Sequence, residues 1–201
     1  MKKGGAHLLM LASLAGTGLT QADSLPEALG SSFEAINHVD MGRLQRDPLQ
    51  EFCSKPRGQA GDSAMESALR DEAMASVVFP EGDDFIGDWA RGADVANNGR
   101  GLQYSDDPEA PNGGNCYACH QLDPTEVAYG NLGPSLMGYG ARGQSEVMLR
   151  YTWTKLWNTH AYNVCSHMPR FGALGILTEQ QLKDLMAYLF DPDSPVNQSI
   201  E

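Results

Sequence analysis

Residues 116–120 read Cys-Tyr-Ala-Cys-His, so two cysteines stand two residues apart and a histidine follows directly. Two thiols at this spacing can add to the two vinyl groups of one haem, and the adjacent histidine then lies where it can bind the iron. We therefore predict that Cys116 and Cys119 hold one covalent haem c. His120 is predicted to be an axial ligand of its iron.

A zinc site and a redox-active cysteine pair are other uses of such a motif. A structural zinc site needs four ligands, and Cys165, His160 and His167 provide no second pair at metal-ligand spacing. A thioredoxin-like pair follows a strand, whereas residues 111–115 (Pro-Asn-Gly-Gly-Asn) are typical of a loop. The haem interpretation is the better supported of the three.

The N-terminus has the pattern of a secretory signal peptide. Lys2 and Lys3 form a basic start, residues 7–19 are mostly apolar, and Ala22 is a small residue suited to cleavage. We expect residues 1–22 to be removed and the mature chain to be periplasmic, without membrane attachment, because the apolar run is shorter than the roughly 20 residues that span a bilayer. A net charge of -12 over 201 residues also opposes binding to nucleic acid and to anionic lipid.

Three amphipathic segments predict an all-α fold. Apolar residues recur at helical spacing over 85–102, over 145–158 and over 179–190. We expect the first and last of these helices to cross, with Gly92 allowing close approach. The expected architecture is a class I cytochrome c-like domain over residues 85–201, preceded by a helical or irregular N-terminal extension over 23–84.

The glycine-punctuated segment 129–136 predicts a loop. A histidine that binds iron needs an acceptor for its other ring nitrogen, and the backbone carbonyl of Pro134 is the candidate for His120. A simple surface turn is the alternative. The indole of Trp153 or Trp157 is a candidate lining of the haem pocket, with its N–H on a polar partner such as a haem carboxylate, and both can instead be ordinary core residues.

Met168 is the strongest candidate for the second axial ligand of the iron. Pro169 disfavours helical backbone at Met168 and so directs its thioether away from a regular helix. Met137, in the glycine-rich loop, is an alternative. His167 is another, because imidazole also binds haem iron.

Beyond these motifs, the sequence resembles the single-haem SoxX subunits of the SoxAX cytochromes over nearly the whole mature chain. The most specific matches are the run from Gly113 to Gln121 and the run from Met168 to Gly172. The other matching stretches are Arg46-Asp47-Pro48-Leu49-Gln50 with Cys53-Ser54, Gly87-Asp88-Trp89, Gly99-Arg100-Gly101-Leu102-Gln103, Gly133-Pro134-Ser135-Leu136 and Cys165-Ser166-His167. A small polar residue precedes the ligating methionine in that family, and His167 departs from this pattern.

The resemblance implies a heterodimer with a SoxA-like cytochrome subunit that carries one or two haems. In that complex the SoxA-like subunit couples thiosulfate oxidatively to a cysteine of the SoxYZ carrier, an L-cysteine S-thiosulfotransferase activity. This chain is then expected to be the electron relay that reduces a small soluble cytochrome c, with no catalytic site of its own. An independent electron carrier is one alternative, and a haem enzyme with a labile sixth ligand is another.

Cys53 and Cys165 are predicted to form a disulfide. Export permits such a bond, these are the only cysteines outside the haem motif, and Cys165 stands three residues before Met168. The bond would tie the N-terminal extension to the segment that carries the candidate methionine ligand. Two free buried thiols or a reactive Cys165 are the alternatives.

Overall fold

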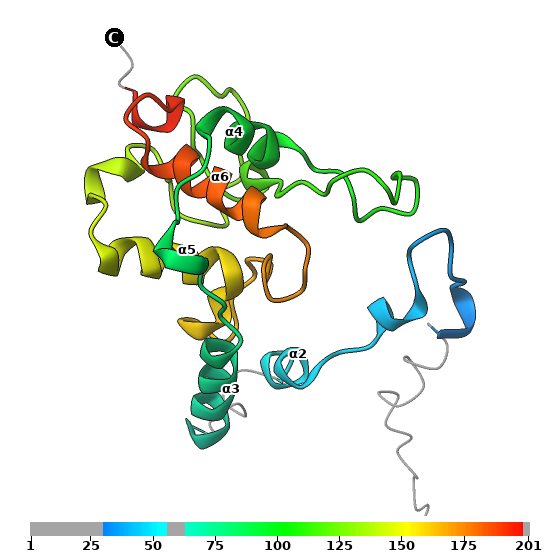
Figure 1. Ribbon diagram of the computed structural model, residues 1–201. Helices are drawn as coiled ribbons and strands as arrows, with labels where there is room; N and C mark the ends of the chain where they lie inside the picture. Colours follow the sequence, from blue (N-terminus) through cyan, green and yellow to red (C-terminus); the bar gives the residue numbers. More distant parts are fainter. Residues whose placement is uncertain (1–29, 56–62, 199–201) are drawn as a thin grey trace, which may run out of the picture. The chain divides into compact units, whose positions relative to one another are not determined.

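The computed structural model describes residues 30–55 and 63–198, and within those ranges it contains helices and no β-strand (Figure 1). Its α-helices are α2 (Pro48–Cys53), α3 (Ser63–Ala75), α4 (Trp89–Asn97), α5 (Glu146–Asn158) and α6 (Glu179–Phe190). Its 3-10 helices are η1 (Met41–Leu44), η2 (Glu81–Asp83), η3 (Cys116–Ala118), η4 (Tyr139–Arg142), η5 (Thr159–Ala161) and η6 (Pro195–Asn197). The all-α prediction is confirmed.

The chain divides into two units, Met1–Glu34 and Ala35–Glu201, and the fold described below is that of the second unit. The predicted signal peptide, residues 1–22, lies outside the described residues. No helix in the described part of the chain has both the length and the apolar character needed to cross a bilayer.

Helices α4 and α6 pack directly against each other, as predicted (Figure 1). Gly92 makes this possible, because a Cβ atom at that position would collide with the backbone carbonyl of Asp184 and lie 2.8 Å from Cβ of Tyr188. The apolar stripe of α6, from Leu182 to Phe190, is buried at the centre of the hydrophobic core. The crossing therefore packs the helix that precedes the haem motif against the helix that follows Met168 in the chain.

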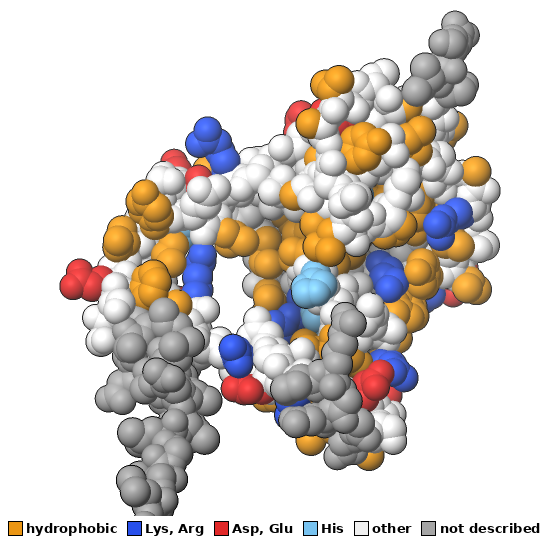
Figure 2. Space-filling model, turned by 180° about the vertical axis from the view of Figure 1, so that it is seen from behind, with side chains coloured by type: hydrophobic (Ala, Val, Ile, Leu, Met, Phe, Trp, Pro, Cys, Tyr) orange, Lys and Arg blue, Asp and Glu red, His pale blue; other side chains and the backbone are white. Residues whose placement is uncertain are grey.

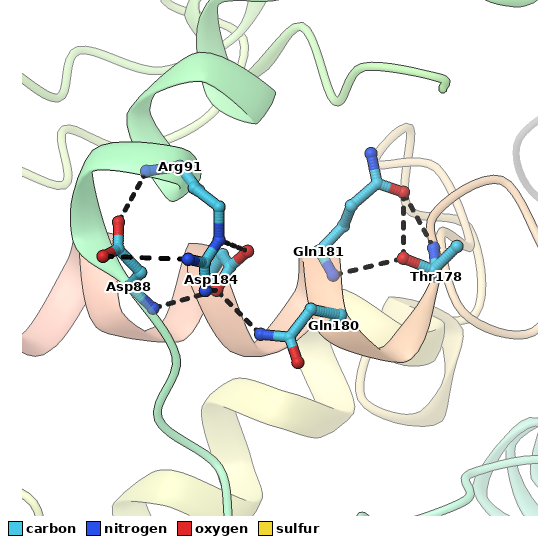
Figure 3. A network of polar contacts seen from close by, with 6 residues as sticks. All are labelled: Asp88, Arg91, Thr178, Gln180, Gln181 and Asp184. Atoms are coloured by element: carbon cyan, nitrogen blue, oxygen red, sulfur yellow. Dashed lines mark hydrogen bonds and ion pairs between the residues drawn. The ribbon is translucent and has the colours of Figure 1, made fainter. Parts of the chain in front are cut away.

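An ion pair stabilises the same crossing. The buried carboxylate of Asp184 on α6 accepts hydrogen bonds of 2.9 Å from the Arg91 guanidinium, from the backbone N–H of Asp88 and from the Gln180 amide (Figure 3). Burial alone would raise the pKa of Asp184, but these three donors hold it below its usual value. Asp184 is therefore a buried anion with its partners in place.

The α4 helix is shorter than the sequence pattern suggested, since it covers residues 89–97 and not 85–102. Asp88 begins the helix, because its side chain accepts the backbone N–H of Arg91. Gly101 adopts a φ of +113°, which is incompatible with a helix at the other end of the predicted range. Phe85, before the helix, is still buried in the core.

The other two helix predictions are confirmed at their boundaries. Ser145 caps α5 by accepting the backbone N–H of Met148, and Thr178 and Gln181 form a capping box at the start of α6 (Figure 3). The indole N–H of Trp153 donates to the carbonyl of Val78, and that of Trp157 donates to Ser76, each over 2.8 Å. Each indole N–H thus has a polar partner, but the partner is a backbone carbonyl of the segment after α3 in place of a haem carboxylate, which favours the alternative that both tryptophans are ordinary core residues.

A disulfide joins helix α2 to a distant part of this unit. Cys53, the last residue of α2, is bonded to Cys165 across 112 residues, with 5.4 Å between their Cα atoms, which confirms the predicted pairing. Asp47 at the start of α2 pairs with Arg170 over 2.6 Å. Both contacts fall on the segment that contains Met168, so α2 restrains that segment from two sides.

Candidate functional site

The haem motif folds as a tight turn that packs against α4, although it comes later in the chain. Residues 116–118 form η3, and the carbonyl of Cys116 accepts the backbone N–H of Cys119 at 3.1 Å and that of His120 at 2.9 Å. Just before it, the N–H of Gly114 donates to the carbonyl of Val95 over 2.8 Å. The two cysteines and the histidine are thereby placed on one turn that is fixed to α4.

The ring of His120 is oriented by the loop after it. Its Nδ1 lies 2.7 Å from the carbonyl oxygen of Pro134, and because a carbonyl only accepts, Nδ1 carries the proton. In the neutral ring, this tautomer places the lone pair on the other nitrogen, Nε2, the atom with which such an imidazole binds a metal. Gly133 is required here, because a Cβ atom at its position would collide with the His120 ring.

Met168 lies in an irregular segment, as its neighbour Pro169 suggested. Its backbone N–H donates to the Ser166 hydroxyl over 3.2 Å, and the disulfide at Cys165 and the Arg170–Asp47 ion pair flank it. The segment is held by these contacts in place of helix hydrogen bonds. Met168 is partly buried and packs against the hydrophobic core.

A cavity of about 550 Å³ brings the predicted site residues together. They are Cys116, Cys119, His120, Pro134, Cys165 and Met168. His167, the rival ligand, lines the same cavity, whereas Met137 does not and is 40% exposed. Cys53, the disulfide partner of Cys165, does not line this cavity and lines a smaller one next to it.

The cavity fits a haem in size and in chemistry. Its volume lies within the roughly 300–1,000 Å³ of small-molecule sites, and its apolar wall includes Leu136, Leu156, Phe171 and Leu189. Cys116 and Cys119 are free thiols, and both are partly buried. Burial, with a further contribution from Cys119, raises the pKa of Cys116 to about 12, so this thiol is protonated at neutral pH.

Different residues of this cavity have different roles in binding a haem. Cys116 and Cys119 provide the thiols for covalent attachment, while His120 and Met168 are the candidate iron ligands. A bound haem supplies one-electron chemistry between ferric and ferrous iron. Pro134 and Gly133 fix the His120 ring, and the apolar wall would keep water away from the iron of a bound haem.

Several residues of this cavity were not predicted from the sequence. Arg142 from η4 and Lys155 from α5 place basic side chains on its wall, and Tyr139 and Thr152 add hydroxyl groups that hydrogen-bond each other over 2.8 Å. The helical spacing of Tyr151 and Lys155, four residues apart, was the available signal, since it puts both on one face of α5. Nothing in the sequence marked Arg142.

Comparison with known proteins agrees with this geometry. The cytochrome c family matches residues 91–191, a range that contains the haem motif, the Pro134 loop and Met168. The chain is also 37% identical, over 154 residues, to an "uncharacterized lipoprotein" of Aquifex aeolicus (strain VF5), a match that covers 76% of this chain and 73% of that protein.

The chain belongs to the cytochrome c family. Its helical fold is that of a cytochrome c domain, which covers residues 91–191. Such a domain implies covalent haem c and electron transfer through it.

Proposed function

We propose that this chain is the electron-transfer subunit of a SoxAX-type complex in the periplasm. The main support for the electron-transfer role is that Cys116, Cys119, His120 and Met168 line the same cavity. With both axial positions of the iron filled by protein, no coordination site is left for a substrate, which suits electron transfer between centres.

The reaction served by the complex releases electrons. A thiolate of the SoxYZ carrier and the outer sulfur of thiosulfate form a sulfur–sulfur bond, and two electrons leave the pair. The SoxA-like subunit is the proposed site of that bond formation. This chain takes up the electrons one at a time and passes them to a small soluble cytochrome c.

Three features support this assignment over an unspecified electron carrier. The sequence runs 113–121 and 168–172 resemble SoxX subunits. The extension before the cytochrome c domain is bonded through Cys53 to Cys165, beside the haem cavity, although a haem core needs no such segment. Export is supported by the signal-like N-terminus and by the Aquifex aeolicus relative, which is named a lipoprotein.

The test is reduction of the haem-loaded chain by thiosulfate, followed in the visible spectrum. We expect reduction only when a SoxA-like subunit and a SoxYZ carrier are both present, and no thiosulfate conjugation by this chain alone. Turnover by the isolated chain, together with cyanide binding to its reduced form, would establish the haem-enzyme alternative. Failure to bind the SoxA-like subunit or to accept its electrons would favour an independent carrier.

A further inference from the structure

We propose that Lys155 and Arg142 are the cationic partners of the two carboxylate side chains of the haem, and that their charge raises the reduction potential of the iron. This inference rests on the proposed function only in requiring that the cavity holds a haem. It adds two residues that neither the sequence motifs nor the family assignment identifies.

The first observation is the charge of the cavity wall. The chain has 26 acidic and 14 basic residues, yet no Asp or Glu is found among the described residues that line the haem cavity. The basic side chains there are Lys155, Arg142 and the two histidines His120 and His167. On the face shown in Figure 2, histidine and Lys or Arg side chains lie beside the hydrophobic side chains near the middle. A wall of this kind suits a ligand that is largely apolar and carries negative charge at one side.

The second observation is that neither cation forms an ion pair with another residue in the described part of the chain. The ion pairs found there involve Arg70, Arg91, Arg150, Arg170 and Lys183, but not Lys155 or Arg142. Lys155 is half-buried, and burial lowers its pKa, so the ammonium group lacks a compensating anion. A haem carboxylate would provide that anion.

The third observation is that aromatic rings hold both cations in position. The Lys155 ammonium lies 5.0 Å from the ring centre of Tyr162 and 5.8 Å from that of Tyr151. The Arg142 guanidinium lies 4.5 Å from the ring centre of Tyr139, which is buried and hydrogen-bonded to Thr152 on α5. Cation–π contacts of this kind fix a side chain while leaving its N–H donors available.

The effect on the iron follows from charge. Ferric haem carries one more positive charge than ferrous haem, so a nearby cation disfavours the ferric state and raises the potential. An unpaired haem carboxylate has the opposite effect. Neutralising both carboxylates within the cavity therefore makes this haem a better acceptor of electrons, which is what a relay requires.

The experiment compares Lys155→Met, Arg142→Met, Lys155→Arg and Lys183→Met in the haem-loaded full chain. Lys183 serves as the matched control, because it pairs with Asp84 and Glu179 and lies outside the cavity. We expect the reduction potential to fall in Lys155→Met and Arg142→Met, to be retained in Lys155→Arg, and to change least in Lys183→Met. The shift at Lys155 should persist at high salt, since screening is weaker for partly buried charges.

Resonance Raman bands of the haem carboxylates give a second readout, which reports their hydrogen bonding directly. We expect these bands to shift in Lys155→Met and Arg142→Met but not in Lys183→Met. Potentials and bands that change no more than in Lys183→Met would overturn the inference, as would an equal fall in Lys155→Arg, which would point to packing. A haem stain of the denatured wild-type chain tests the premise separately, since absence of covalent haem contradicts the proposed function itself.

Discussion

The Nδ1 atom of His120 lies 2.7 Å from the carbonyl oxygen of Pro134, fourteen residues further along the chain. Backbone hydrogen bonds close the loop between them, from Gly133 N–H to the Cys119 carbonyl over 2.9 Å and from Leu136 N–H to the Gln121 carbonyl over 2.8 Å. The loop therefore fixes both the ring plane and the proton of His120.

Replacement of Gly133 by alanine should disturb the iron ligand. The added Cβ meets the His120 ring, and relieving that overlap costs about 1–3 kcal/mol or moves the loop away from the ring. We expect an altered haem spectrum and a lower free energy of unfolding, measured with denaturant. Gly30→Ala is the control, since its Cβ meets no atom within 4 Å. Equal behaviour of the two variants would show that the loop does not position the histidine.

Met168→Ala should remove the far-red charge-transfer band of the oxidised haem, because that band arises from iron–methionine ligation. The reduction potential should fall as well, since a thioether ligand raises it relative to two histidines. His167→Gln is the matched variant on the neighbouring residue and should leave the band in place. A band lost in His167→Gln and retained in Met168→Ala would assign the ligand to the histidine.

Loss of the disulfide should destabilise the protein strongly. The bond closes a chain separation of 112 residues, for which the chain-entropy argument gives about 4–5 kcal/mol, less where the haem already restrains the unfolded chain. We expect Cys53→Ser with Cys165→Ser to unfold at lower denaturant and to lose the methionine band more readily on warming. In the native oxidised protein neither cysteine should react with an alkylating reagent. Alkylation of both would contradict the bond.

Asp184→Asn should weaken the crossing of α4 and α6. The substitution removes the charge that Arg91, Gln180 and the Asp88 backbone satisfy, at a cost of about 2–3 kcal/mol in the free energy of unfolding. Asp94→Asn is the control, because Asp94 is on α4, the other helix of the crossing, and its side chain is exposed. Chemical denaturation at neutral pH measures both, and similar stabilities would contradict the role of the buried carboxylate.

The same carboxylate predicts how stability depends on pH. The pKa of Asp184 is lower in the folded chain than its usual value of 3.8, so its contribution is fully present above that value. It is lost as the pH falls from about 3.8 through the lower folded pKa. The stability difference between the wild type and Asp184→Asn should therefore shrink over that acidic range. A difference that stays constant there would mean that Asp184 binds its proton equally in both states.

The sequence was sufficient to identify the parts of this protein whose signals are local. The haem motif is five consecutive residues, and the starts of α5 and α6 follow from Ser145 and Thr178, whose side chains satisfy backbone N–H groups a few residues away. Gly92 indicated where α4 and α6 approach. The α4 ends were misjudged, because the apolar pattern continues into Phe85, which is buried without being helical.

The tertiary structure alone decided which distant residues share the haem cavity. The indole groups of Trp153 and Trp157 bind backbone carbonyls near residue 77, a choice that depends on how the segment after α3 packs and not on either tryptophan. Lys155 and Arg142 carry no motif, and their position on the cavity wall depends on the placement of α5 and η4. A side-chain pattern predicts structure over about one helical turn. A cofactor site is formed by contacts between residues far apart in the chain. The basic residues of this cavity wall can therefore be identified only in the folded chain.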